Sequence, residues 1–180
     1  MLTQSLIQAV AKDRAAYLAQ IANITEAQAQ WKPNPESWNI IENTEHLFWA
    51  EHGAIFGMWK TLTAIRAGNF ERSFERSFES NHKDMPIDEI IRLTWKPKEI
   101  VPAVAAPRMG GPLSFWIASL HGLQDLLASF GEFIQDDELR LQAHPHPISG
   151  AMDFQQRLEF LSFHIARHQE QCANLIAKMG

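Results

Sequence analysis

Hydrophobic residues recur along most of the chain at the spacing of about 3.6 residues that places them on one side of an α-helix. This pattern predicts four long helices and one short one, over residues 2–24, 40–66, 87–94, 113–134 and 152–179. No segment of useful length alternates between apolar and polar residues as a half-buried strand does. The sequence therefore predicts an all-α fold.

The connection between the second and third long helices sets the expected topology. Residues 68–112 contain the short helix but are otherwise irregular, and a plain loop of that length is uncommon in a compact domain. The prolines and glycines of its last part, KPKEIVPAVAAPRMGGP, favour an extended, packed segment. We predict a four-helix bundle with one long crossover connection between helices 2 and 3, formed by a single domain over residues 1–180.

Composition and charge narrow the classes of function. The 180 residues carry a formal net charge of -5, and their Lys and Arg residues are scattered singly, so a nucleic-acid partner is not expected. No run of 18 apolar residues and no signal-peptide layout is present, which favours a soluble cytoplasmic protein without a membrane partner. Cys172 is the only cysteine, which excludes a disulfide framework.

Two histidines near the C-terminus, in FLSFHIARHQEQC, stand where leucines would be expected. His164 and His168 are four residues apart, so both imidazoles project from one face of a helix. A third ligand must come from a neighbouring helix, and His46 sits on a stripe followed by the small residues Gly53 and Gly57 that would let another helix come close. His46, His164 and His168 together are a candidate three-imidazole metal site with positions left for water or substrate.

Other residues near these histidines have two interpretations. Glu42 pairs with Asn39 in a capping-box pattern that begins the second long helix, and one turn before His46 it could also orient that ring. Cys172 continues the histidine stripe but lies a further turn along the axis, so core packing is the better interpretation.

Two further motifs attract attention. His144 and His146 of HPHP each precede a proline, which favours a turn over a metal-binding tract. Phe70, Phe74 and Phe78 repeat every four residues, and as a helix they would form an aromatic stripe that packs on the chain's own bundle or against a second subunit.

Two segments resemble the DinB-like (DinB/YfiT) superfamily of four-helix-bundle proteins, which are proposed metalloenzymes. WKPNPESWNIIENTEHL is similar to the family pattern W-x-P-x-P-x-x-W-[STN]-x-x-E-x-x-x-H-L, and the stretch from His146 to Gln171 is similar to the closing H-P-x-x-G followed by H-x-x-x-x-H-x-x-Q. The matching residues are Trp31, Pro33, Trp38, Asn39, Glu42, His46, Leu47, His146, Pro147, Gly150, His164, His168 and Gln171. One departure is Ile165, where many relatives carry Glu.

The resemblance implies a divalent metal, typically zinc or nickel, held by His46, His164 and His168. It also implies a small-molecule substrate and allows a homodimer, but it does not fix a reaction. Thiol-dependent S-transferases and isomerases occur among the relatives, and a low-molecular-weight thiol would need room near Trp38, Trp49 and Arg167. A hydrolase would need a base, for which Glu42 is the nearest candidate in the sequence.

Two alternatives remain open at this stage. The chain could be a non-catalytic, stress-linked binding protein whose metal site is structural or vestigial and whose working surface is the phenylalanine repeat. It could also be a metal-free bundle with buried polar histidines, which would bind no ion at all.

Overall fold

The computed structural model describes residues 1–69, 82–95 and 101–179, and the regular structure within these ranges is helical. No strand forms among the described residues, where extended segments meet only at two isolated bridges before the last helix. The predicted all-α class is therefore confirmed. The elements are α1 (Leu2–Ile21), α2 (Glu26–Gln30), α3 (Ile40–Arg66), α5 (Ile87–Thr94), α6 (Leu113–Phe133), a 3-10 turn (Asp136–Glu138) and α7 (Phe154–Met179).

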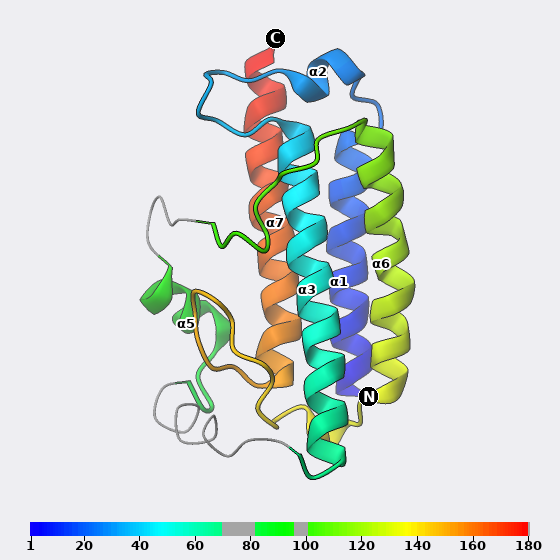
Figure 1. Cartoon of the computed structure of the whole chain (residues 1–180), viewed down its shortest axis with the longest axis vertical. Helices are drawn as coiled ribbons and strands as arrows, with labels where there is room; N and C mark the ends of the chain where they lie inside the picture. The colour runs from blue at the N-terminus through cyan, green and yellow to red at the C-terminus, as the bar shows by residue number, and fades with distance from the viewer. Residues whose placement is uncertain (70–81, 96–100, 180) are drawn as a thin grey trace.

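The four long helices α1, α3, α6 and α7 lie side by side (Figure 1). α1 contacts α7 and α6, and α3 contacts α6 and α7. Figure 1 shows that α3 and α6 run in the same direction, so α3 ends and α6 begins at opposite ends of the molecule. Within the described part of the connection, residues 101–112 are irregular and lie against α3, where the backbone of Ala105 and Arg108 contacts His46 and Glu45.

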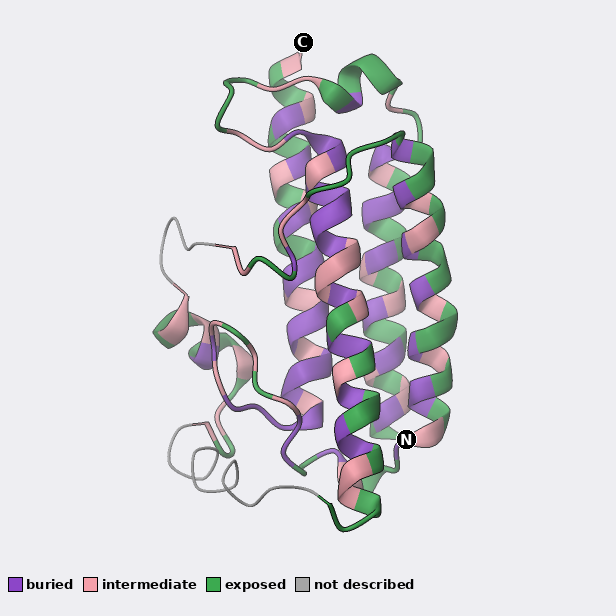
Figure 2. Cartoon of the chain, in the orientation of Figure 1, coloured by how far each residue is buried: buried purple, intermediate pink, exposed green. Residues whose placement is uncertain are grey.

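Buried positions follow the inward sides of the four long helices (Figure 2). Their apolar side chains form one continuous core because each helix carries hydrophobic residues at helical spacing. Fully buried members from the four helices include Val10, Tyr17, Leu47, Met58, Trp116, Leu127, Leu158 and Ile165. A smaller cluster of Ile90, Met152 and Phe160 packs α5 against α7.

The ends of the helices differ from the prediction mainly after α1. The first helix ends at Ile21, and a separate short helix, α2, follows it. Thr25 and Gln28 form a capping box that begins α2, a signal that the hydrophobic pattern did not show. The capping box of Asn39 and Glu42 at the start of α3 is confirmed by both of its hydrogen bonds, each 2.8 Å long.

None of the described helices is both long and apolar enough to cross a membrane. The predicted aromatic stripe of Phe70, Phe74 and Phe78 lies outside the described residues.

Candidate metal centre

Three buried histidines converge between α3 and α7. His46 comes from α3, His164 and His168 come from α7, and one ring nitrogen of each lies within 4.8 Å of the others. Nε2 of His164 is 3.1 Å from Nε2 of His46 and 3.2 Å from Nε2 of His168. The sequence-predicted residues are therefore brought together, with the same nitrogen of each ring facing a common point.

Hydrogen bonds on the far side of two of the rings fix where their protons lie. Nδ1 of His46 donates to the carbonyl oxygen of Ala105 at 2.8 Å, and Nδ1 of His168 donates to Oδ1 of Asn43 at 2.9 Å. The Asn43 amide cannot be reversed without loss, because its Nδ2 donates to the carbonyl oxygen of Asn39. In their neutral forms, His46 and His168 therefore present Nε2 lone pairs to the centre.

This arrangement fits a divalent cation better than it fits protons. Nε2 of His164 can donate to only one of the two lone pairs that face it, so protons alone leave at least one buried acceptor unmatched. Nitrogens bound to one ion at about 2.0–2.1 Å lie roughly 3 Å apart or slightly more, which is the separation found here. Burial lowers the pKa of all three histidines, most strongly for His164 and His168, so the lone pairs are available at neutral pH.

A buried carboxylate holds the backbone segment that orients His46. Glu45 accepts hydrogen bonds from the N–H groups of Arg108, Met109 and Gly110 at 2.7–2.9 Å, and from the indole of Trp49. Burial alone would raise the pKa of Glu45, but these donors bring it below its ordinary value. Because the same segment carries Ala105, this clamp fixes the carbonyl group that accepts from His46.

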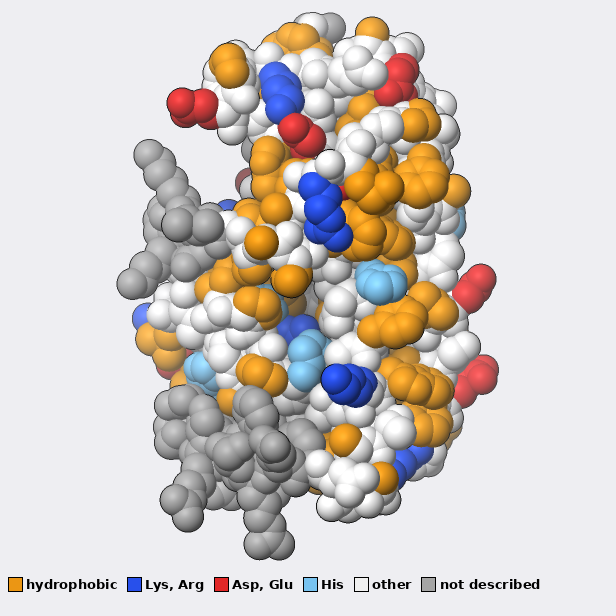
Figure 3. All heavy atoms as spheres, in the orientation of Figure 1, with side chains coloured by type: hydrophobic (Ala, Val, Ile, Leu, Met, Phe, Trp, Pro, Cys, Tyr) orange, Lys and Arg blue, Asp and Glu red, His pale blue; other side chains and the backbone are white. Residues whose placement is uncertain are grey.

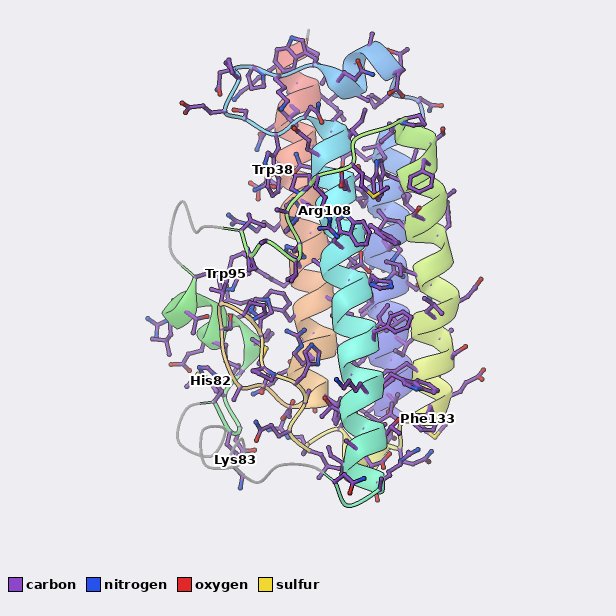
Figure 4. The ribbon with its side chains drawn as sticks, in the orientation of Figure 1. Trp38, His82, Lys83, Trp95, Arg108 and Phe133 are labelled. Atoms are coloured by element: carbon purple, nitrogen blue, oxygen red, sulfur yellow. The ribbon has the colours of Figure 1, made fainter. Side chains whose placement is uncertain are left out.

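The three histidines line a cavity of about 890 Å³ that lies against α3 and α7. Its walls include the aromatic rings of Trp38, Trp49, Trp95 and Phe160. The ring of Trp38 is 5.0 Å from that of His46, and the ring of Trp95 is 6.1 Å from that of His164. Figure 4 shows Trp38, Trp95 and Arg108 approaching from three different segments: the residues before α3, the end of α5 and the connection before α6.

Positive charge is concentrated at this cavity although the chain as a whole is acidic. Arg108, Arg157, Arg167 and Lys178 line it, whereas Glu36 is the only carboxylate among the described lining residues. On the face drawn in Figure 3, Lys, Arg and His side chains gather around the hollow, and carboxylates lie mostly toward the edges. The cavity therefore suits a ligand that carries negative charge.

The HPHP segment forms the predicted turn but also reaches the cavity. Nδ1 of His146 accepts from the N–H groups of Ile148 and Ser149, and Gly150 closes the turn at a positive φ of 74°. His144 lies so close to α3 that a Cβ on Gly57 would be 2.5 Å from its ring. Gly57 thus admits a histidine side chain, rather than the neighbouring helix that the sequence led us to expect.

The other predicted site residues divide into two groups. Trp38, Trp49 and Arg167 line the cavity as expected. Glu42 does not orient His46: its carboxylate accepts from the N–H group of Asn39 and pairs with Lys32 at 2.7 Å.

Cys172 is buried in the core, where its sulfur lies 3.6 Å from the hydroxyl of Tyr17, which confirms the core-packing interpretation.

Sequence reasoning missed the other side chains that shape the cavity. Trp95 and Arg108 come from the irregular connection, where no periodicity marks them. Arg157 could have been predicted to lie near the site, because it comes seven residues before His164 and hence lies on the same face of the helix.

The described regular structure is helical, and three buried histidines that could hold a metal ion line a large cavity. These features are typical of helical metal-binding proteins. The chain belongs to the DinB superfamily, whose sequence pattern matches residues 9–172.

A conserved protein from Enterococcus faecalis has a similar crystal structure, with a TM-score of 0.58 and 15% sequence identity over 96% of this chain and 94% of that one. This similarity supports the fold alone. No curated protein matched the chain significantly.

Proposed function

We propose that the protein is a metal-dependent enzyme, built as a four-helix bundle with a long crossover connection, whose zinc or nickel ion is held by His46, His164 and His168. The observation that carries the proposal is the pair of Nε2 lone pairs that face His164 in a buried site. A divalent ion held there would lower the pKa of a thiol beside it, so that thiolate is present at neutral pH.

We favour transfer of a low-molecular-weight thiol to a small electrophilic substrate over hydrolysis. An ion lowers the pKa of a bound water as it does that of a thiol, but hydrolysis of an ester or amide also calls for a side chain that passes a proton to the leaving group. Glu42 is engaged at the helix start, and Glu36, the one described carboxylate that lines the cavity, is exposed. A thiolate needs no such side chain when it displaces a group that leaves as a stable anion, such as a halide.

The chain's own residues would then bind and orient the reactants. The rings of Trp38, Trp49 and Trp95 provide apolar surface for the carbon skeletons, and the cations of the cavity attract anionic groups. In the transfer, the sulfur forms a bond to an electrophilic carbon and the leaving group departs. Nδ1–H of His46 and of His168 stays bound to Ala105 and Asn43, which keeps both rings in place throughout.

Assays of zinc-loaded and nickel-loaded protein with simple thiols and a chloroarene electrophile test this proposal, with p-nitrophenyl acetate as the hydrolytic comparison. We expect thiol conjugation that saturates with thiol and is lost in His46→Gln. Ester hydrolysis without conjugation would favour the hydrolase alternative. Activity that is equal in the wild type and in His46→Gln would contradict a reaction at this site.

The proposal also covers the substrate, the partners, the location and the oligomeric state of the protein. We propose a small-molecule substrate, no nucleic-acid or membrane partner, a cytoplasmic location and a homodimer as the oligomeric state to test. If the ion binds but no reaction is found, we would favour the alternative of a non-catalytic binding protein whose metal site is structural.

A further inference from the structure

Besides the three histidines, the cavity has another buried polar group, the guanidinium of Arg157, which pairs with no described carboxylate. Arg157 lies in the first turns of α7 and is 3% exposed. Its Nη2 donates to Nε2 of His144 at 2.9 Å, but Nε and Nη1 have no hydrogen-bond partner. No carboxylate among the described residues pairs with this guanidinium. A buried cation without a counter-charge is costly, so folding alone does not explain its presence.

The ring nitrogens of His144 and His146 that accept hydrogen bonds are already occupied, so these rings offer only N–H groups to a ligand. Because a guanidinium can only donate, Nε2 of His144 accepts and the proton of this ring lies on Nδ1, which is buried without an acceptor. Nδ1 of His146 accepts two backbone N–H groups, so its proton lies on Nε2. The unpaired polar atoms of these side chains are therefore N–H groups, whereas the three-histidine end presents lone pairs.

The two ends are at a distance that one small molecule can span. Arg157 and His164 are seven residues apart on α7, which places them on one face and roughly 10 Å apart along the axis. Both line the same cavity. Phe160 lies between them in the helix, and its ring centre is 6.0 Å from the guanidinium of Arg157. The ring stacks on that of His164 at 5.7 Å and is tilted against that of His146 at 4.4 Å. An apolar wall thus connects the donor end to the metal end.

We propose that Arg157, together with His144, binds a carboxylate or phosphate group of the small molecule whose reactive group lies at the three histidines. The anion supplies an acceptor to one or more of the donors that lack one, which are Nε and Nη1 of Arg157 and Nδ1 of His144, and it neutralises the buried charge. The anion site itself is independent of the proposed function, and only its connection to the reactive group rests on that function.

The other cations of the cavity are less suited to this role. Arg167 and Arg108 are exposed and lie over the rings of Trp95 and Trp49, at 5.5 Å and 4.0 Å from the ring centres. Exposed cations attract anions over a distance but contribute little to holding them, because water and salt screen them. Arg167 is therefore a matched control for Arg157: it has the same charge, in the same helix, at the same cavity.

The first test uses metal-free protein titrated with acetate and, separately, with inorganic phosphate at constant ionic strength, followed by calorimetry. We expect the wild type to bind at least one of the two anions, and the one that binds identifies the group. Arg157→Met should weaken binding by about tenfold or more, since hydrogen bonds to charged groups are lost. Arg167→Met should leave the affinity nearly unchanged.

Two further variants keep the test decisive if Arg157→Met folds poorly. Gly57→Ala places a Cβ 2.5 Å from the ring of His144 and should displace it, whereas a Cβ on Gly53, one turn earlier in α3, meets open space. We expect weaker anion binding in Gly57→Ala and unchanged binding in Gly53→Ala. Arg157→Lys keeps the charge without the guanidinium fork and should bind with intermediate affinity.

A second test asks whether the anion site and the metal site bind one molecule. Cobalt-loaded protein is titrated with ω-mercaptocarboxylates of increasing chain length and with the matched ω-mercaptoalcohols, and thiol binding is read from the visible spectrum. At one chain length the carboxylate should raise the affinity by about tenfold over the alcohol, and Arg157→Met should abolish this difference without weakening the alcohol.

The two tests separate the two claims. If neither thiol series binds but acetate or phosphate binds through Arg157, the anion site stands and the proposed function fails. Absence of anion binding to the wild type, or equal losses in Arg157→Met and Arg167→Met, would overturn the anion site. A thiol carboxylate that binds no better than its alcohol at any length would overturn the link between the two ends.

Discussion

Two buried arginines show how differently the two sides of this molecule use charge. Arg14 of α1 is 2% exposed, and all three of its guanidinium nitrogens donate, two to Glu51 of α3 and one to Gln124 of α6. Arg157 is 3% exposed, and only one of its three nitrogens has a partner. The residue type and the burial are the same, yet only Arg14 pairs with a carboxylate among the residues that the structure describes.

The difference indicates which buried polar groups serve the fold and which serve a ligand. Arg14 and Glu51 connect α1 with α3, and neither of them lines the cavity at the three histidines, so the partners of this guanidinium come from the chain itself. Arg157 and the three histidines face a cavity that can admit a ligand, and there the unmatched groups are complementary to an anion and a cation. Changes on the first side should affect stability, and changes on the second side should affect binding.

Breaking the Arg14–Glu51 pair should have the largest effect. Glu51→Ala leaves Arg14 buried without its carboxylate, and we expect the free energy of unfolding to fall by about 3–5 kcal/mol. Arg157→Met, which removes a charge that has no counter-ion, should cost little or none. Urea denaturation of both variants measures the contrast. Similar losses in the two variants would show that Arg157 is as structural as Arg14.

Removing the metal should have the next largest effect on stability. Binding to the folded state alone stabilises it by about 2.7–4.1 kcal/mol at 100–1,000 times the dissociation constant. We expect a chelator to lower the melting temperature of the wild type accordingly and to leave that of His168→Ala unchanged. The measurement is thermal unfolding of metal-loaded protein with and without chelator. An equal response of the two proteins would place the stabilising metal elsewhere.

Removing the hydrogen bond that orients His168 should have a smaller effect, which is limited to the affinity for the metal ion. Asn43→Leu removes the oxygen that accepts from Nδ1 of His168 and should weaken metal binding by about 10–100-fold. Asn174→Leu changes another asparagine that lines the cavity but makes no hydrogen bond to the three histidines, and it serves as the control. Competition with a coloured chelator gives both affinities. Equal affinities in Asn43→Leu and the wild type would contradict the orienting role.

The smallest effect concerns pH at the donor end of the cavity. Burial, together with the nearby charge of Arg157, lowers the pKa of His144 from 6.5 to about 3. Between these values the unfolded chain binds a proton that the folded chain does not, so stability falls as the pH falls below about 6.5. Between pH 7 and pH 5, metal-free wild type should lose about 1–2 kcal/mol more than His144→Gln. Parallel pH profiles of unfolding would show that His144 titrates normally.

The helical fold and the three histidines could be predicted because both depend on short-range spacing. A period of 3.6 residues marks a helix, and a separation of four residues puts His164 and His168 on one face. The acceptor for His46 could not be predicted, since it is the carbonyl oxygen of Ala105 in an irregular connection. Glu42 drew attention as that acceptor because it is one turn away in sequence, but the helix start uses its carboxylate.

Arg157 illustrates the limit of reasoning from a sequence. Its spacing from His164 places it on the cavity side of α7, yet what distinguishes it is that no carboxylate in the described part of the chain pairs with it. A missing partner depends on how all the other elements pack, and local patterns carry no information about it. The same limit applies to Arg14, whose counter-ion Glu51 lies 37 residues away on another helix.

Metal content is the most direct test of the central claim, which is that the three histidines hold one divalent ion. The measurement is elemental analysis of protein purified without a metal-affinity tag, wild type beside the His164→Ala His168→Ala double variant. We expect one zinc or nickel ion per chain in the wild type and none in the double variant. Wild type that remains without stoichiometric metal after exposure to zinc and nickel would contradict it.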